Sequence, residues 1–290
     1  MKLERIKGNT FFLPSPTNVG IYFDGRRAYV VDTADERTTK NLIKYLLDED
    51  KEIVAVTLTH SHADHIRGCA RVKNLSGAPV YAPAGEVSFV RFPELEGYVL
   101  YGAASPRFMH SGFFRATPCD AEIVREDTIP FKIIKLPGHT IDHIGYMTED
   151  GVLFSGDAYF GMRVLKKYPY PYLTDVEKSL ESFKNLESLD AEFFLPAHGD
   201  PTSDPTKEIG YQRSLLENII QRTLSLLSVP KSREELVKEL FGDEGDPGMY
   251  YLAHSFVGAI LTFLDSHGDI ELVSSQGDMV LYPQKWQIRR

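Results

Sequence analysis

Of this 290-residue chain, the segment Thr59–His60–Ser61–His62–Ala63–Asp64–His65 is the most informative about the fold. It overlaps the end of Ile53–Thr59 (IVAVTLT), an apolar and β-branched run that predicts a buried strand. In layered α/β proteins, side chains that follow a strand gather at the sheet edge where ligands bind. Three imidazoles and a carboxylate within six residues suit a divalent metal that prefers nitrogen and oxygen donors.

The spacing inside this motif suggests two neighbouring ions rather than one. His60 and His62 alternate, so both can point toward one ion. Asp64 and His65 follow them and can turn toward a second ion. A lone histidine is usually a satisfied structural residue, but that explanation does not account for three histidines at this spacing.

Strand and helix patterns surround the motif on both sides. Two segments at 35–50 and 175–189 have helical apolar spacing, with Leu42, Ile43, Leu46 and Leu47 as the stripe of the first. The predicted strands, besides the one before the motif, are Thr10–Leu13, Asn18–Phe23, Ala28–Asp32, Phe131–Leu136, Ile144–Met147, Val152–Ser155 and Phe193–Leu195.

The character of the chain changes after about residue 205. Helical spacing covers Thr206–Ser228, a capping box at Ser232–Glu235 opens a helix through Leu240, and a third helix is predicted over Tyr250–Ser266. Two strands, Ile270–Val273 and Met279–Tyr282, would form a hairpin around Gln276–Gly277. Three helices and a hairpin are the element order of a winged-helix domain, which predicts domains at 1–204 and 205–290.

Residues 84–127 interrupt this regular pattern and predict an insertion that is partly helical. A long segment inside a compact domain is usually functional or disordered, and this one is too aromatic for disorder. We expect a lid over the site that also takes part in a homodimer contact. Its aromatic residues are Phe89, Phe92, Tyr98, Tyr101, Phe108, Phe113 and Phe114.

Composition narrows the class of protein. The apolar fraction of 42% and the charged fraction of 25% are those of a globular protein, and no window resembles a membrane-spanning helix. No secretory pattern follows the first residues, and Cys69 and Cys119 cannot build a disulfide framework. We therefore expect a cytoplasmic protein without a membrane partner. The net charge of −9 disfavours nucleic acid as a partner.

The motif at 59–65 resembles that of the metallo-β-lactamase superfamily, and three further motifs occur in the family's order. They are Leu136–Thr140 (LPGHT), Phe154–Asp157 (FSGD) and Pro196–Gly199 (PAHG). The resemblance covers about residues 8–200 and implies an α+β fold, an αββα sandwich with the site at one edge between two sheets. It implies one metal held by His60, His62 and His139, a second held by Asp64, His65 and His198, and Asp157 as the bridge.

The resemblance also implies a chemistry. Two divalent ions about 3.5–4 Å apart share a water and lower its pKa, so that a metal-bridged hydroxide attacks a carbonyl or phosphoryl centre. Asp64 could orient this nucleophile and is the predicted catalytic residue. We expect a binuclear hydrolase of a small ester, thioester or lactone. Zinc is the expected metal, with iron and manganese as alternatives that the ligands do not separate.

A second segment refines the resemblance. Pro137–Tyr146 (PGHTIDHIGY) looks like the segment of glyoxalase II-type hydrolases, but Asp142 stands where these usually carry Gly. His143 has a structural role or supports the metal ligands. Lys166, Lys167 and Tyr168 follow the Asp157 strand and either line the substrate pocket or lie on the surface.

Two other activities remain open. The C-terminal domain resembles the winged-helix tail of β-lactamase-like endoribonucleases, which would make the protein a phosphodiesterase or ribonuclease. Residues 200–290 carry 9 basic and 14 acidic residues, a net charge of −5, so packing, dimerisation or shaping of the site is the favoured role. The other alternative is an iron-dependent sulfur dioxygenase. A flavin-partnered diiron reductase would need a flavodoxin-like domain after residue 200, and no such pattern follows.

Overall fold

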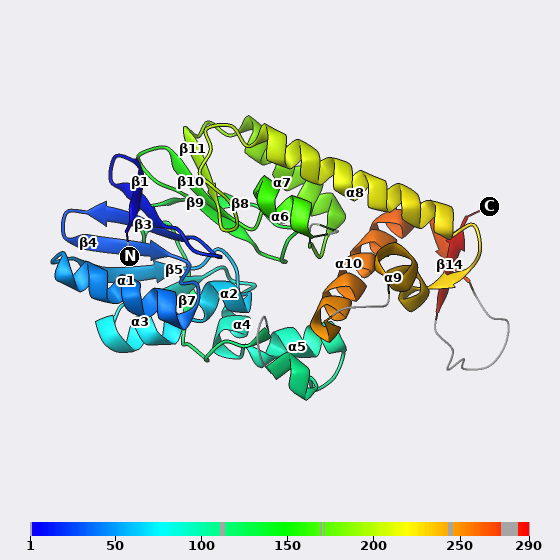
Figure 1. Cartoon of the computed structure of the whole chain (residues 1–290), viewed down its shortest axis with the longest axis horizontal. Coiled ribbons are helices and arrows are strands. Elements are labelled where there is room, and N and C mark those ends of the chain that lie inside the picture. Colours follow the sequence, from blue (N-terminus) through cyan, green and yellow to red (C-terminus); the bar gives the residue numbers. More distant parts are fainter. Residues whose placement is uncertain are drawn as a thin grey trace.

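Two stacked sheets with helices on their outer faces form the body of the molecule (Figure 1). The structure, a computed structural model, describes residues 2–110, 114–168, 170, 172–242, 246–273 and 284–289. Aromatic side chains from both sheets meet between them, with the Phe131 ring 5.8 Å from Tyr22 and 6.5 Å from Phe154. The predicted αββα sandwich is confirmed.

The first sheet has seven strands in chain order. They are β1 (Glu4–Lys7), β2 (Thr10–Leu13), β3 (Val19–Asp24), β4 (Arg27–Val31), β5 (Glu52–Thr57), β6 (Val80–Ala82) and β7 (Glu122–Ile123). Pairing is antiparallel from β1 to β4 and parallel from β4 to β7. Parallel pairing brings the carboxyl ends of β4 and β5 to the same edge, where the metal motif begins.

The second sheet has four strands in the order β11-β10-β9-β8. They are β8 (Lys132–Lys135), β9 (Ile144–Met147), β10 (Val152–Gly156) and β11 (Phe193–Pro196). β10 pairs parallel with β11 and antiparallel with β9. The strands predicted in this part of the sequence are confirmed.

Helices cover the outer faces through their apolar stripes. On the first sheet lie α1 (Glu36–Asp48), capped by the Asp35 carboxylate, and α3 (Cys69–Ser76). On the second lie α7 (Val176–Ser188) and the first turns of α8 (Thr206–Leu226). Leu47, which the sequence assigned to the stripe of α1, is instead 69% exposed.

Short helices gather near the edge that carries the metal motif. They are α2 (Ala63–Ile66), α4 (Val87–Arg91), α5 (Glu94–Tyr101), the 3-10 helix η1 (Arg107–His110) and α6 (Met162–Lys167). α4, α5 and η1 belong to the insertion, so its partly helical character is confirmed. Phe113 lies outside the described residues.

The C-terminal part contains α8, α9 (Arg233–Phe241), α10 (Pro247–Ser266) and a small sheet. The predicted capping box is present, because the Ser232 and Glu235 side chains bond each other's backbone N–H. The sheet has the order β12-β14-β13, with β12 (Lys231–Ser232), β13 (Ile270–Leu272) and β14 (Lys285–Ile288). The partner of β13 is therefore β14, which the sequence did not predict, and Met279–Tyr282 lies outside the described residues.

α8 belongs to both parts of the chain. Ile209 near its start packs in the cluster beneath the second sheet, with Phe183 and Leu186 of α7. Leu216, Ile219 and Ile220 further along pack with α10 in a separate cluster. Within the described residues, no helix combines the length and apolar character needed to cross a bilayer.

We predict that Gly20→Ala lowers the free energy of unfolding by about 1–3 kcal/mol, because an added Cβ would overpack the space between the sheets. That Cβ would lie 2.6 Å from the Phe154 ring of the facing sheet. Gly210→Ala in α8 is the control: no atom lies within 4 Å of its Cβ, and alanine favours a helix by up to about 1 kcal/mol. Urea unfolding measures both, and equal effects would contradict the predicted packing.

Candidate metal centre

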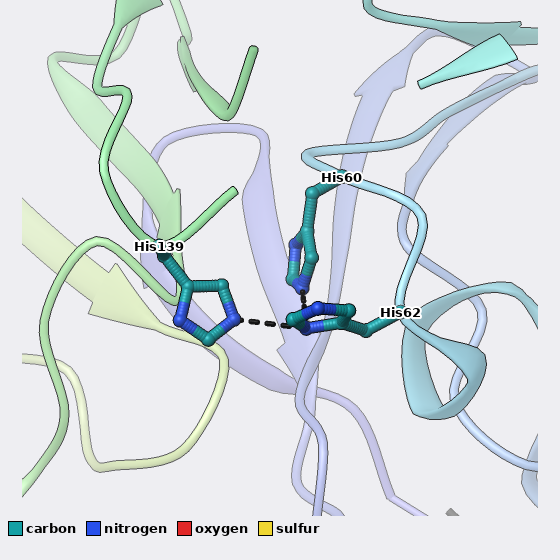
Figure 2. A group of neighbouring side chains, drawn as sticks. All are labelled: His60, His62 and His139. Atoms are coloured by element: carbon teal, nitrogen blue, oxygen red, sulfur yellow. Dashed lines mark hydrogen bonds between the residues drawn. The ribbon is translucent and has the colours of Figure 1, made fainter. Parts of the chain in front are cut away.

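Three imidazoles meet at the edge between the sheets (Figure 2). His60 and His62 come from the loop after β5, and His139 comes from the loop between β8 and β9. His62 Nδ1 lies 3.0 Å from His60 Nε2 and 2.9 Å from His139 Nε2. Nitrogens bound to one tetrahedral zinc ion at about 2.0–2.1 Å lie roughly 3.3 Å apart, so the trio fits a single ion.

Hydrogen bonds to backbone carbonyls hold two of the predicted ligand rings in place, through the ring nitrogen that faces away from the candidate site. His139 Nδ1 donates to the Tyr172 carbonyl at 3.0 Å, and His198 Nδ1 donates to the Pro16 carbonyl at 2.6 Å. Each bond fixes the tautomer that leaves Nε2 free to bind a metal.

Asp64, His65 and His198 form a second group beside the first. His198 Nε2 lies 3.2 Å from Asp64 Oδ2, and His65 Nε2 lies 3.8 Å from the same oxygen. His65 Nε2 is buried and has no hydrogen-bond partner in the described residues. A metal ion would satisfy this donor atom.

Asp157, at the end of β10, lies between the two groups. Its Oδ2 is 3.4 Å from His139 Nε2 in one group and 3.5 Å from His198 Nε2 in the other. Its Oδ1 is buried without a hydrogen-bond partner and lies 3.5 Å from His65 Nε2. This position allows one carboxylate to contact two ions, as the sequence resemblance implied.

The electrostatics of the first group favour neutral imidazoles. Burial lowers the pKa of His60 well below its ordinary value, that of His62 to about 4 and that of His139 to about 3. These rings are therefore unprotonated at neutral pH. A histidine must be neutral to bind a metal, so the first group is prepared for an ion.

The second group is dominated by negative charge. Burial alone would raise the pKa of Asp157, but His198 and His65 hold it well below its ordinary value. Burial alone would lower the pKa of His65, but Asp32, Asp64 and Asp157 raise it well above. The negative charge of these carboxylates must be compensated, and a divalent ion can supply the positive charge.

Asp32 is a functional residue that sequence reasoning missed. Its Oδ2 accepts a hydrogen bond from His65 Nδ1 at 2.8 Å, and its Oδ1 accepts one from the Thr59 N–H at 2.9 Å. The Asp32 carboxylate therefore orients His65, a predicted metal ligand, from the side of the ring that faces away from the site. The signal was present, because Asp32 directly follows β4, the parallel neighbour of β5.

Glu86, also missed, joins the two loops that carry the first group. Its carboxylate accepts hydrogen bonds from Ser61 Oγ and, at 2.7 Å, from Thr140 Oγ1. Asp142 belongs to the same support, since it accepts a bond from the Gly85 N–H at 3.0 Å and pairs with Lys135 at 2.8 Å. Asp142, which stands where glyoxalase II-type hydrolases usually carry Gly, thus stabilises this loop and is not one of the predicted metal ligands.

His143 supports the bridging residue. It is buried, and its Nε2 accepts a hydrogen bond from the Asp157 N–H at 3.0 Å. The other histidines lie elsewhere: His110 is exposed and bonds the Ser105 carbonyl, His254 faces Glu234, and His267 bonds the Phe263 carbonyl. None of these three lines the cavity described next.

A cavity of about 680 Å³ leads to the metal centre, and Asp64, Asp157 and the imidazoles of His62, His139 and His198 line one end of it. Lys167 and Tyr168 line it as well, together with Arg163, which sequence reasoning missed. Lys166 is exposed and is not among the lining residues. The structure thus brings Lys167 and Tyr168 to the site and leaves Lys166 outside it.

Comparison with known proteins agrees with this geometry. The family model described as the metallo-β-lactamase superfamily matches residues 13–198, the segment that carries all seven predicted ligands. The chain belongs to the metallo-β-lactamase superfamily. The matched segment ends at His198, so the family assignment covers the sandwich and not the C-terminal part.

Individual members of the superfamily add detail. A hydroxyacylglutathione hydrolase from Halorhodospira halophila is 32% identical over 136 residues, which cover 47% of this chain and 43% of that protein. The matches span about half the length of such curated relatives.

Two solved structures share the fold over nearly the whole chain. A metallo-β-lactamase family protein from Thermus thermophilus covers 97% of this chain and 99% of its own, with a TM-score of 0.71 and 20% identity. A β-lactamase domain protein from Burkholderia ambifaria covers 99% and 94%, with a TM-score of 0.74 and 19% identity.

We predict that Asp32→Asn weakens binding of one of two metal ions about 10–100-fold, because His65 loses the carboxylate that orients it. Titration with zinc against a chromophoric chelator measures both affinities. Asp24→Asn, an exposed position on β3, is the matched control. An Asp32→Asn protein that bound both ions like the control would contradict the assignment.

Proposed function

We propose that the protein is a metal-dependent hydrolase that holds two divalent ions between its sheets. The observation that carries this proposal is the arrangement of seven ligand side chains in two groups that share Asp157, at the end of a 680 Å³ cavity. The first ion would be held by His60, His62 and His139, and the second by Asp64, His65 and His198.

Bound there, the ions would lower the pKa of a shared water and stabilise negative charge on a substrate oxygen. Asp64 is the candidate catalytic residue, because it lines the cavity beside both groups. Its Oδ2 accepts a hydrogen bond from Thr17 Oγ1 at 2.9 Å, which fixes the carboxylate. His65 and His198 hold its pKa below the ordinary value against the effect of burial, so it remains an acceptor that can orient a water.

A thioester is the substrate class that we propose. The hydroxyacylglutathione hydrolases that resemble the chain are named for hydrolysis of such a bond. Water would add its oxygen to the acyl carbon, the C–S bond would break, and the sulfur would leave as a thiol. Arg163 and Lys167 lie four residues apart on α6 and line the cavity, so they are placed to bind an anionic part of the substrate.

The residues after 205 are proposed to form a winged-helix-like domain that completes the site rather than binding nucleic acid. Met249 and Leu252 of α10 line the cavity, which ties this part to the active site. Residues 200–290 carry a net charge of −5 and offer few cations for a phosphate backbone. Zinc is the proposed metal, and elemental analysis separates it from iron and manganese, including the iron that a sulfur dioxygenase would need.

We predict close to two transition-metal ions per chain and hydrolysis of S-acyl glutathione thioesters that a chelator abolishes and added zinc restores. Asp157→Ala should lower kcat/KM at least about 100-fold, because removing an interaction with a metal site costs this much or more. Asp190→Ala, an exposed position, is the control. Full turnover after chelation or in Asp157→Ala would refute the proposal.

We predict that Lys167→Ala raises KM for an anionic thioester about three- to tenfold, the effect of losing one hydrogen bond worth about 0.5–1.5 kcal/mol. Lys166→Ala removes the same charge one residue away, outside the cavity, and should change KM less than about twofold. Steady-state kinetics with both variants provide the measurement. Equal changes in KM would show that α6 acts only through its overall charge.

We predict weak RNA binding because the C-terminal part is acidic. A gel-shift titration of the full chain with single-stranded RNA at low salt tests this expectation. Tight binding that weakens steeply with salt would instead favour the phosphodiesterase alternative.

A further inference from the structure

Two segments far apart in the sequence build one side of the cavity. Phe114 comes from the insertion, and Met249 and Leu252 come from the first turns of α10. Tyr170, which precedes α7, lines the same side. In Figure 1, α5 and the start of α10 lie next to each other, while α6 lies on the other side of this region. We call Phe114, Tyr170, Met249 and Leu252 the apolar wall.

Close contacts hold the apolar wall in place. A Cβ on Gly248 would lie 2.5 Å from Phe114 Cε2, so the insertion packs directly on the start of α10. The Tyr170 hydroxyl donates to the Met249 carbonyl at 3.3 Å, and its ring stacks on Phe256 at 4.9 Å. The wall is therefore a fixed surface made by tertiary packing.

The wall differs in chemistry from the rest of the cavity. From Pro247 to Leu264, α10 carries no acidic, lysine or arginine side chain. The charged side chains of the lining come from other segments: Asp64 and Asp157 at the candidate metal centre, Asp35 before α1, Arg67 at the end of α2, and Arg163 and Lys167 on α6. A ligand that fills the cavity thus meets charged side chains from several segments and an apolar surface at the wall.

Glu96 of α5, which also lines the cavity, does not change this description. Burial raises its pKa to about 8, with Asp64 and Glu86 adding to the rise and Arg67 opposing it. A raised pKa favours the neutral form of the carboxyl, which adds less charge beside the wall than a carboxylate would.

We propose that the apolar wall binds the acyl chain of the substrate, so that the enzyme acts on thioesters of apolar acyl groups in preference to acetyl. This inference rests on the proposed thioester hydrolysis. The scissile carbonyl must reach the proposed metal centre. The cationic side chains of α6 complement the charge of the anionic thiol portion. The apolar wall then remains to bind the acyl group. The cavity of about 680 Å³ lies within the range of roughly 300–1,000 Å³ typical of small-molecule sites.

The test is a series of glutathione thioesters with acetyl, butyryl, hexanoyl and octanoyl groups. For the wild-type holoenzyme, kcat/KM should rise about fourfold per methylene until the wall is covered. Leu252→Trp places a larger side chain in the cavity beside the wall. It should therefore reduce kcat/KM for the octanoyl thioester at least about tenfold more than for the acetyl thioester. Leu252→Ala should weaken the dependence on chain length. Thr262→Trp, exposed on the same helix and outside the cavity, should keep the wild-type profile.

Metal content and thermal unfolding confirm that each variant is folded and loaded. Hydrolysis with no dependence on chain length, or an equal loss for all substrates in Leu252→Trp, would overturn the inference while leaving thioester hydrolysis intact. Calorimetric binding of hexanoate and octanoate to the wild-type protein separates the two proposals. One outcome would be fatty-acid binding that depends on chain length and is lost in Leu252→Trp, with no hydrolysis of any thioester. It would support the assignment of the apolar wall to acyl chains and refute the proposed reaction.

Discussion

The carboxylates of Asp32, Asp64 and Asp157 are concentrated at the edge between the two sheets, and the fold has to compensate their charge there. Among the described residues, Asp32, Asp64 and Asp157 form ion pairs with imidazoles and with no lysine or arginine. Buried carboxylates are costly unless cations or donors compensate them. The fold meets this demand by placing His65 and His198 against them and by leaving buried atoms that a divalent ion would satisfy.

Residues of both sheets contribute to this charge compensation, because the two sheets approach each other closely at Gly156. Gly156 ends β10 with a φ of +54°, and a Cβ there would lie 2.6 Å from His143 Nε2 and 2.7 Å from Thr59 Oγ1. Only glycine accepts both this conformation and this spacing without strain. The absence of a side chain lets Asp157 of one sheet approach the loop after β5 of the other, where the predicted ligands lie.

Sequence reasoning reached what is local in the chain. The ligand motif and the strands and helices with clear apolar periods were predictable, because each pattern is contained in a short window. The short strands β1, β6, β7, β12 and β14 were not predicted. The roles of Asp32 and Glu86 were not predicted, because their hydrogen-bond partners His65 and Ser61 lie 33 and 25 residues away in the sequence. Lys166 and Lys167 could not be told apart, since neighbouring residues differ only by a rotation of about 100° on a helix. The apolar wall depends on the packing of two segments that no local pattern connects.

The shared helix α8 has a consequence for how far the two parts of the chain depend on each other. Its first turns complete the core beneath the second sheet, and its later turns complete the C-terminal core. At about 1.5 Å per residue, its 21 residues span roughly 30 Å between them. Replacing the chain after residue 205 would therefore also remove the α8 residues that pack beneath the second sheet, so the two cores are not structurally independent.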